Sequence, residues 1–188
     1  MAISINEINS GLTILLDGQI YSVLEYQHVK PGKGAAFVRT KLRNFRDGRV
    51  LDRTFKGDEK IEEAFIEERK LQYLYRADKT YNFMDQQNFE EVAIPKDTLR
   101  EKINFLKDSL QITAYSYKGK ILSVELPTFI ELKIVHTEPG LRGDTAKQAM
   151  KIATVETGVD IQVPLFIKEG DTIKVDTRSG QYVERAAK

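Results

Sequence analysis

The sequence predicts an all-β protein made of three small domains in series. Short runs in which apolar and polar residues alternate recur along the chain, as they do in half-buried strands. Turn-forming pairs such as Asp-Gly, Lys-Gly, Thr-Gly and Ser-Gly separate these runs, and one stretch has helix signals. We expect domains over residues 1–64, 65–127 and 128–188. Because domains of about 60 residues have marginal cores, neighbouring domains should support each other and the whole should be elongated.

The first domain is predicted to be a small antiparallel sheet. The pair Asp17-Gly18 between two alternating runs is typical of a two-residue type I′ hairpin. In the run from Phe37 to Phe45, one face would carry mainly apolar residues and the other face cations. A second turn, Asp47-Gly48, leads into the next run. The predicted strands are Thr13–Leu16, Gln19–Tyr26, Phe37–Phe45 and Arg49–Phe55.

The second and third domains are predicted to be Greek-key barrels of the OB type. Several short strands interrupted by one helix suit such a barrel. The helix is expected over Leu99–Leu106, with Thr98 and Glu101 at the spacing of a capping box. Residues 128–188 have the same sequence pattern, in which glycine turns separate short alternating runs. Beyond the helix, the predicted strands are Gln111–Tyr117, Lys120–Leu126, Phe129–Thr137, Ile152–Val155, Val159–Ile167, Thr172–Asp176 and Gln181–Arg185.

A loop of small residues, Lys30-Pro31-Gly32-Lys33-Gly34, separates two strands of the first domain. Pro31 and Gly32 suit the central positions of a type II turn, in which Gly32 would take positive φ. Such a turn would present the Lys33 side chain at an unshielded apex. No Asp or Glu occurs from Tyr26 through Arg46 to neutralise it. The turn by itself is more typical of a plain hairpin tip, so the loop alone does not decide its role.

Charge is distributed unevenly along a chain whose net charge is only +1. Between His28 and Lys56 there are nine Lys or Arg residues and two Asp residues, so the rest of the chain carries a net −6. These cations favour a sheet surface that faces RNA or DNA, with an ordinary solvated strand face as the alternative. The residues predicted to bind RNA are Arg39, Lys41, Arg43, Arg49 and Arg53.

The residue types predict a binding protein rather than an enzyme. The chain has no cysteine, and its two histidines, His28 and His136, fall in different predicted domains. We therefore expect no catalytic residues, no metal site and no cofactor. The N-terminus lacks the pattern of a signal peptide, and no apolar run reaches the roughly 20 residues that span a bilayer. We expect a soluble, cytoplasmic protein without membrane contact.

Alternating aromatic residues in the second domain leave two interpretations open. Tyr73, Tyr75, Tyr81 and Phe83 are spaced as the core of a barrel, which we favour, but OB barrels also stack bases on such side chains. In the second interpretation the protein is a general single-stranded nucleic-acid-binding module.

Three separate motifs resemble one known family. The run from Val29 to Phe37, followed by Lys41-Leu42-Arg43-Asn44, resembles the N-terminal domain of bacterial elongation factor P. The loop from Pro139 to Thr145 and the ending from Val163 to Val183 resemble the third domain of the same family. The similarity runs from about residue 3 to residue 185 in unbroken order.

The resemblance implies a KOW/SH3-like barrel followed by two OB domains, together shaped like tRNA. It implies a monomeric translation factor that binds the ribosome between the P and E sites and stimulates peptide-bond formation at consecutive prolines. Lys33, with Lys30, Pro31, Gly32 and Gly34 around it, would be the loop tip that reaches the CCA end of peptidyl-tRNA. A lysine-modifying enzyme would be a further partner. A loop near the E-site codon would comprise Arg142, Gly143, Asp144 and Thr145. An elongation factor P-like paralogue is the alternative within this family.

Overall fold

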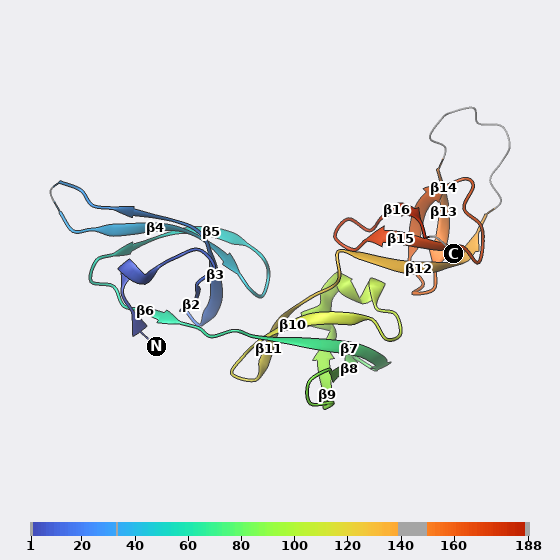
Figure 1. The fold of residues 1–188 in the computed structure, drawn as a ribbon, viewed down its shortest axis with the longest axis horizontal. Helices are drawn as coiled ribbons and strands as arrows, with labels where there is room; N and C mark the ends of the chain where they lie inside the picture. The colour runs from blue at the N-terminus through green and yellow to red at the C-terminus, as the bar shows by residue number, and fades with distance from the viewer. Residues whose placement is uncertain (1, 33, 139–149, 187–188) are drawn as a thin grey trace. The chain divides into compact units, whose positions relative to one another are not determined.

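The computed structural model describes residues 2–32, 34–138 and 150–186, which form three β-sheets (Figure 1). The all-β prediction is confirmed, since the helical segments are short and the remaining elements are strands. Lys33 and the residues from Arg142 to Thr145 lie outside the described residues.

The first sheet has six strands in the order β1-β6-β2-β3-β4-β5. Asp17 and Gly18 both have positive φ, 50° and 75°, which confirms the type I′ hairpin between β2 and β3. Two short strands at the ends of this domain, β1 and β6, were not expected from the sequence, and they pair with each other. The elements are β1 Ala2–Ile3, η1 Ile5–Glu7, β2 Thr13–Leu16, β3 Gln19–Val29, β4 Phe37–Asn44, β5 Val50–Lys56 and β6 Ile61–Glu63.

An apolar cluster lies inside this sheet and includes one face of β4. Val38 and Leu42 of β4 are fully buried, and Val38 lies opposite the buried Phe55 of β5. Full burial of such side chains contributes about 1.5–3 kcal/mol each, so the cluster holds β4 and β5 firmly. The other members are Ile3, Ile5, Ile8, Ile14, Tyr21, Val23 and Ile61.

The second sheet has five strands in the order β11-β10-β7-β8-β9. Three of the four alternating aromatics are core residues: Tyr73, Tyr81 and Phe83 are at most 9% exposed, and the Tyr73 and Phe83 rings lie 5.4 Å apart. Tyr75 is half exposed, and its hydroxyl donates a hydrogen bond to Glu91. The strands are β7 Glu67–Ala77, β8 Thr80–Asp85, β9 Glu91–Pro95, β10 Gln111–Tyr117 and β11 Lys120–Glu125.

The helix between β9 and β10 differs from the prediction. It begins at Lys96 rather than at Leu99, and α1 (Lys96–Leu99) gives way to the 3-10 helix η2 (Arg100–Phe105). Pro95 is the N-cap residue and no side chain caps the helix, so the capping box predicted at Thr98 does not form. The fixed φ of proline, here −63°, is compatible with the extended backbone of an N-cap residue. The positive φ of Arg100, 54°, ends the α-helix after one turn.

The third sheet has five strands in the order β14-β13-β12-β15-β16. Three of the predicted strands, Phe129–Thr137, Thr172–Asp176 and Gln181–Arg185, have the predicted bounds. The other two differ, since β13 begins two residues earlier than predicted and β14 ends three residues earlier. The strands are β12 Phe129–Thr137, β13 Met150–Val155, β14 Asp160–Pro164, β15 Thr172–Asp176 and β16 Gln181–Arg185.

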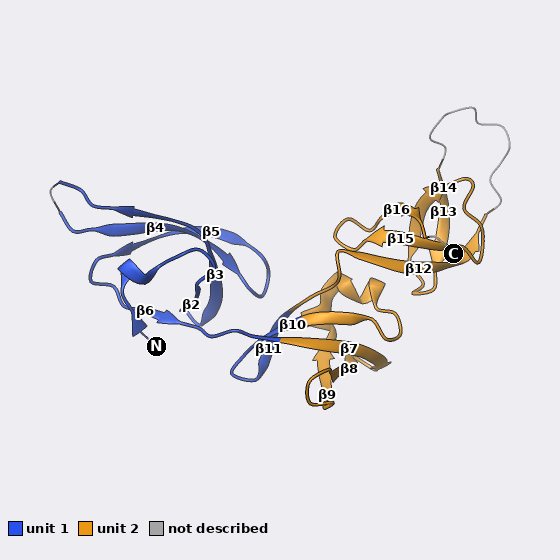
Figure 2. Cartoon of the chain, viewed as in Figure 1, with its two compact units in different colours: residues 1–68, 114–123 blue, residues 69–113, 124–188 orange. Residues whose placement is uncertain are grey.

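By its internal contacts the chain divides into two compact units (Figure 2). The first comprises residues 1–68 and 114–123, and the second comprises residues 69–113 and 124–188. The boundaries of three domains at residues 64 and 127 stay a prediction. Among the described residues, no helix is both long enough and apolar enough to cross a membrane.

A buried ion pair in the second unit should carry measurable stability. Asp85 is 2% exposed, and it accepts hydrogen bonds from the Gln87 amide (2.8 Å) and from Arg69 Nε (2.7 Å). The Gln87 amide and, after it, the Arg69 guanidinium hold the pKa of Asp85 below its ordinary value of 3.8, against the opposing effect of burial. Because the folded-state pKa is lowered, this stabilisation is complete above the ordinary pKa and is lost as the pH falls through the lowered value.

We expect Arg69→Met to lower the free energy of unfolding by about 1–3 kcal/mol near neutral pH, because the buried carboxylate loses a charged donor. Urea titrations at about pH 7 and about pH 3 measure the effect, and the difference from the unmodified protein should shrink at the lower pH. The exposed pair of Lys174 with Glu184 supplies the control, Lys174→Met, which should change stability much less. An equal loss of unfolding free energy in both variants would contradict the larger stabilising role given to the buried pair of Arg69 and Asp85.

Candidate nucleic-acid interface

The basic loop joins β3 and β4 at the end of a long hairpin (Figure 1). The ladder between these strands continues as far as the pair Val29 and Phe37, so the loop begins directly after paired backbone. The predicted type II turn is wrong, since Gly32 does not have positive φ. The residue with positive φ is Gly34, at 111°. Glycine is therefore required on the β4 side of Lys33 rather than on the β3 side.

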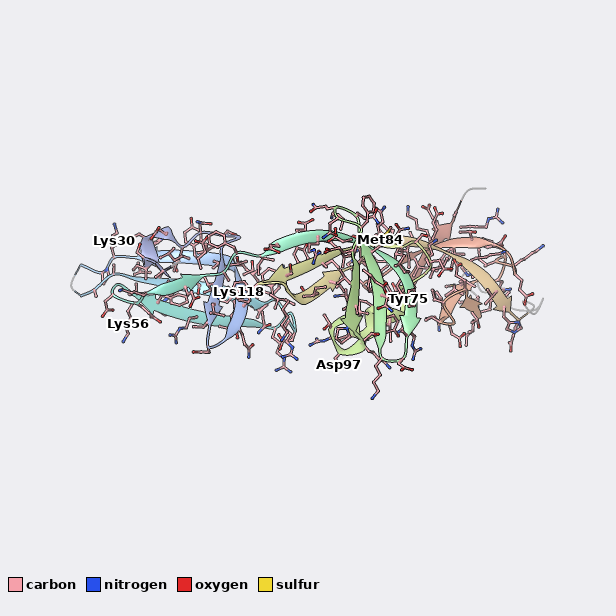
Figure 3. The ribbon with its side chains drawn as sticks, turned by 90° about the horizontal axis from the view of Figure 1, so that it is seen from below. Lys30, Lys56, Tyr75, Met84, Asp97 and Lys118 are labelled. Carbon is pink, nitrogen blue, oxygen red and sulfur yellow. The ribbon has the colours of Figure 1, made fainter. Side chains whose placement is uncertain are left out.

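Cations lie on both sides of the hairpin end. Lys30, before the loop apex, is exposed, and Lys56, at the end of β5, is exposed near the same end of the first sheet (Figure 3). Lys56 lies directly opposite Phe37 in the ladder between β4 and β5. The predicted tip residue Lys33 is outside the described residues.

Side chains of β4 alternate between two faces as predicted. Val38, Thr40 and Leu42 are buried, whereas Arg39 and Arg43 are exposed and Lys41 is half buried. We call the face with Arg39, Lys41 and Arg43 the outer face. It also carries the residues directly opposite these three on β5, because paired residues in an antiparallel ladder share a face. Those residues are Thr54, Asp52 and Val50.

The prediction of one cationic surface is wrong for Arg53. Arg53 lies opposite Thr40 in the ladder, so it is on the face that β4 turns toward the core. Arg53 therefore does not share a face with Arg39 and Arg43, although it is exposed. Arg49 lies in the turn before β5 and is exposed, so it belongs to neither face of the ladder.

Carboxylates pair with three of the five predicted RNA-binding cations. Lys41 Nζ lies 3.3 Å from Glu25, and Arg49 Nε lies 3.6 Å from Asp47. Arg53 lies 2.8 Å from Glu59, which also accepts a hydrogen bond from the Lys56 amide. Arg53 therefore helps to hold the turn after β5.

Within the described part of the chain, Arg39 and Arg43 form no ion pair. The Arg39 guanidinium lies 5.5 Å from the centre of the Phe37 ring. Sequence reasoning missed Phe37 and Lys56 as neighbours of Arg39. Phe37 and Arg39 are two residues apart, so their position on one face of a strand could have been predicted from the sequence. The position of Lys56 near them depends on the pairing register of β4 and β5, which the sequence does not show.

Base stacking in the second domain and metal binding find less support in the structure. Because Tyr73, Tyr81 and Phe83 are buried, they offer no free face on which a base could stack. His28 is exposed on β3, and its ring contacts Tyr26 edge-on at 5.4 Å. Among the described residues, no group of three or more acidic or histidine side chains is arranged to hold a metal ion.

Family models match the chain in three consecutive segments. Residues 4–61 match an elongation factor P KOW-like domain, residues 66–124 an elongation factor P OB domain, and residues 123–185 an elongation factor P C-terminal domain. These matches confirm the predicted order of a KOW-like domain and an OB domain.

Curated relatives cover nearly the whole chain. It is 51% identical over 183 residues to elongation factor P of Natranaerobius thermophilus, covering 97% of each chain. It is 51% identical over 184 residues to elongation factor P of Moorella thermoacetica, covering 98% of this chain and 100% of that one.

Solved structures show a related fold. Translation initiation factor 5A from Methanococcus jannaschii superposes with a TM-score of 0.52 at 23% identity, covering 66% of this chain and 93% of that chain. An initiation factor 5A family protein from Naegleria fowleri gives a TM-score of 0.54 at 14% identity, with 67% and 98% covered.

The two classes of arginine should behave differently toward a polyanion. We expect Arg39→Gln to lower the salt concentration that elutes the protein from heparin, because it removes a charge that has no carboxylate partner among the described residues. Arg53→Gln removes a charge already paired with Glu59, so it should shift elution little and instead lower the thermal midpoint by about 1–3 °C. Heparin chromatography and thermal melting of both variants test this. If Arg53→Gln shifts elution as much as Arg39→Gln does, pairing with a carboxylate does not decide which of these arginines contributes to polyanion binding.

Proposed function

The chain belongs to the elongation factor P family of translation factors, and from this we propose that it acts on ribosomes that stall while joining consecutive prolines. In this proposal it binds between the P and E sites and stimulates peptide-bond formation. It acts as a monomer in the cytoplasm, where its ribosomes are. The single observation that carries the proposal is the match of three family domains in order over residues 4–185.

We propose that Lys33 is the group that reaches the CCA end of the peptidyl-tRNA. The assignment rests on the motif Lys30-Pro31-Gly32-Lys33-Gly34 and on the place of this loop at the end of the β3–β4 hairpin. The end of β4 next to the loop is held against β5 by the buried pair Val38 and Phe55. This supports such a role, because an amine can act by position only if its support is stiff.

The proposed contribution is positional rather than acid–base. Proline is a poor nucleophile in peptide-bond formation for conformational and steric reasons, so restraining the peptidyl-tRNA in a reactive geometry is the useful help. A lysine that works in this way needs donors and reach, but it needs no neighbouring base. A lysine-modifying enzyme that lengthens Lys33 would extend this reach, and we propose such an enzyme as a second partner.

Contacts to the RNA backbone would come from the outer face of β4. Arg39 and Arg43 support this proposal best, because they are exposed and form no ion pair with the described residues. Lys41, Arg49 and Arg53 would contribute less, since each has a carboxylate nearby. By motif match, Arg142, Gly143, Asp144 and Thr145 would form the loop near the E-site codon.

Replacing Lys33 tests the proposal directly. We expect Lys33→Ala to fold normally but to reduce synthesis through a Pro-Pro-Pro reporter to the level seen without the factor, a loss of roughly tenfold or more in rate. In-vitro translation with purified protein measures the effect. Lys118→Ala is the matched control, because Lys118 is also an exposed lysine at a hairpin turn followed by glycine. Undiminished rescue by Lys33→Ala would contradict the proposal.

The variant Lys33→Arg tests whether positive charge at this position is sufficient or whether the lysine amine itself is needed. If lysine geometry or a lysine-specific modification is needed, Lys33→Arg should also fail in the reporter although it keeps the positive charge. Full rescue by Lys33→Arg would mean that charge at this position is sufficient. The intact mass of protein purified from its native host shows whether Lys33 carries an added group.

A further inference from the structure

A groove of about 780 Å³ lies on the outer face, at the end of β4 and β5 nearest the basic loop. Its walls include Phe37 and Arg39 from β4 and Lys56 from β5. Ala35 and Gly57 also line it, and their lack of bulk leaves the space open. A side chain at Gly57 would press against the Ala36 carbonyl, since its Cβ would lie 3.1 Å from that oxygen. Glycine just after β5 therefore lets the backbone approach Ala36 closely beside the groove.

We propose that this groove binds one unpaired nucleotide of RNA, and that it distinguishes the base by its exocyclic amino group. The proposal rests on the proposed function, because it names the part of the RNA that this face would hold. It assigns a recognition role to Phe37, Lys56 and Asp58, none of which belongs to the backbone-contacting set described above.

The stacking surface is the pair of Arg39 and Phe37. A guanidinium held over an aromatic ring presents a flat cationic surface, and bases stack on such surfaces in single-stranded RNA recognition. Other cation–aromatic pairs in the described chain lack these features. The Phe55 and Tyr81 rings beneath Arg53 and Arg76 are buried. The cations over Tyr117 and Phe129 are lysines, which present no flat guanidinium.

Charge in the groove is arranged for a phosphate. Lys56 and Arg39 are exposed, and neither forms an ion pair with a described residue. A phosphate attached to the stacked base could therefore bind to either cation without displacing a carboxylate partner. Asp58 is the one carboxylate among the residues that line the groove, whereas Glu25, nearer the middle of the face, is paired with Lys41.

The carboxylate of Asp58 supplies the base selectivity. Asp58 lines the groove, is exposed, and can only accept hydrogen bonds when ionised. It would accept from the amino group of cytosine but would oppose the carbonyl oxygen at the same position of uracil. The same carboxylate disfavours an acidic peptide as the occupant, because such a peptide would bring further negative charge and has no need of a flat stacking surface.

Nucleotide titration of the isotope-labelled full-length protein tests the proposal by NMR. Cytidine 5′-monophosphate should shift the backbone amides of Phe37, Arg39 and Lys56 saturably, and it should bind roughly threefold to tenfold more tightly than uridine 5′-monophosphate. Asp58→Asn should remove this preference, because an amide offers both a donor and an acceptor.

Two variants test the stacking surface and one controls for it. Phe37→Leu should weaken cytidine monophosphate binding roughly fivefold or more. Arg39→Gln, a change at an exposed side chain, should weaken it similarly even if Phe37→Leu disturbs the fold. Phe129→Leu removes another partly exposed ring under a cation, and it should leave the affinity unchanged.

Ribose 5-phosphate distinguishes a nucleotide site from a simple anion site. If it produces the same shifts and affinity as cytidine monophosphate, or if neither nucleotide moves the groove amides, the proposal is wrong. The Pro-Pro-Pro reporter with Lys33→Ala stays separate from this test. If Lys33→Ala still rescues the reporter while cytidine monophosphate binds in the groove as expected, only the proposed function is wrong. If Lys33→Ala abolishes rescue but the nucleotide does not bind in the groove, only the groove proposal is wrong.

Discussion

The register of β3, β4 and β5 is the constraint on which the candidate interface depends. Each residue of β4 has a fixed partner on β3, and all except Asn44 also have one on β5, so the choice of partner decides which side chains share a face. A shift of one position would place Arg39 over the core and Val38 in solvent. The burial of Val38, Leu42 and Phe55 prevents this shift, because their exposure would cost several kcal/mol. The apolar face thus determines where the cations lie.

Much of this arrangement could be predicted from the sequence. Alternation on β4 separated Val38 and Leu42 from Arg39 and Arg43 without any tertiary information. Asp17-Gly18 predicted a hairpin because few residues other than Asp, Asn and Gly tolerate positive φ at both turn positions. The strand Thr172–Asp176, which has glycine turns on both sides, was predicted to the residue. Local backbone preferences are strong at such positions, so no distant partner can change them.

Features that depend on a partner were not predictable in the same way. Arg53 shares a face with Arg49 by spacing alone, but which face of the sheet that is depends on its pairing with Thr40. Neutralisation of Lys41 comes from Glu25, one residue outside the acid-free stretch, and it becomes visible only across the ladder. The helix start was predicted three residues too late because Thr98 has the residue type of a common N-cap, whereas the helix begins directly after Pro95.

Pairing of charges concentrates the free positive potential at the two ends of the outer face. Glu25 neutralises Lys41 in the middle of β4, while Arg39 on one side and Arg43 on the other have no carboxylate partner among the described residues. At about 3.3 Å per residue, these two arginines are about 13 Å apart along the strand. A uniformly basic strand would attract any polyanion at many equivalent positions. Two separated charges, one of them beside an aromatic ring and a groove, restrict how a chain of phosphates can lie. Because the same strand continues into the basic loop, an RNA held at both points would have its position relative to the loop set by the backbone of β4.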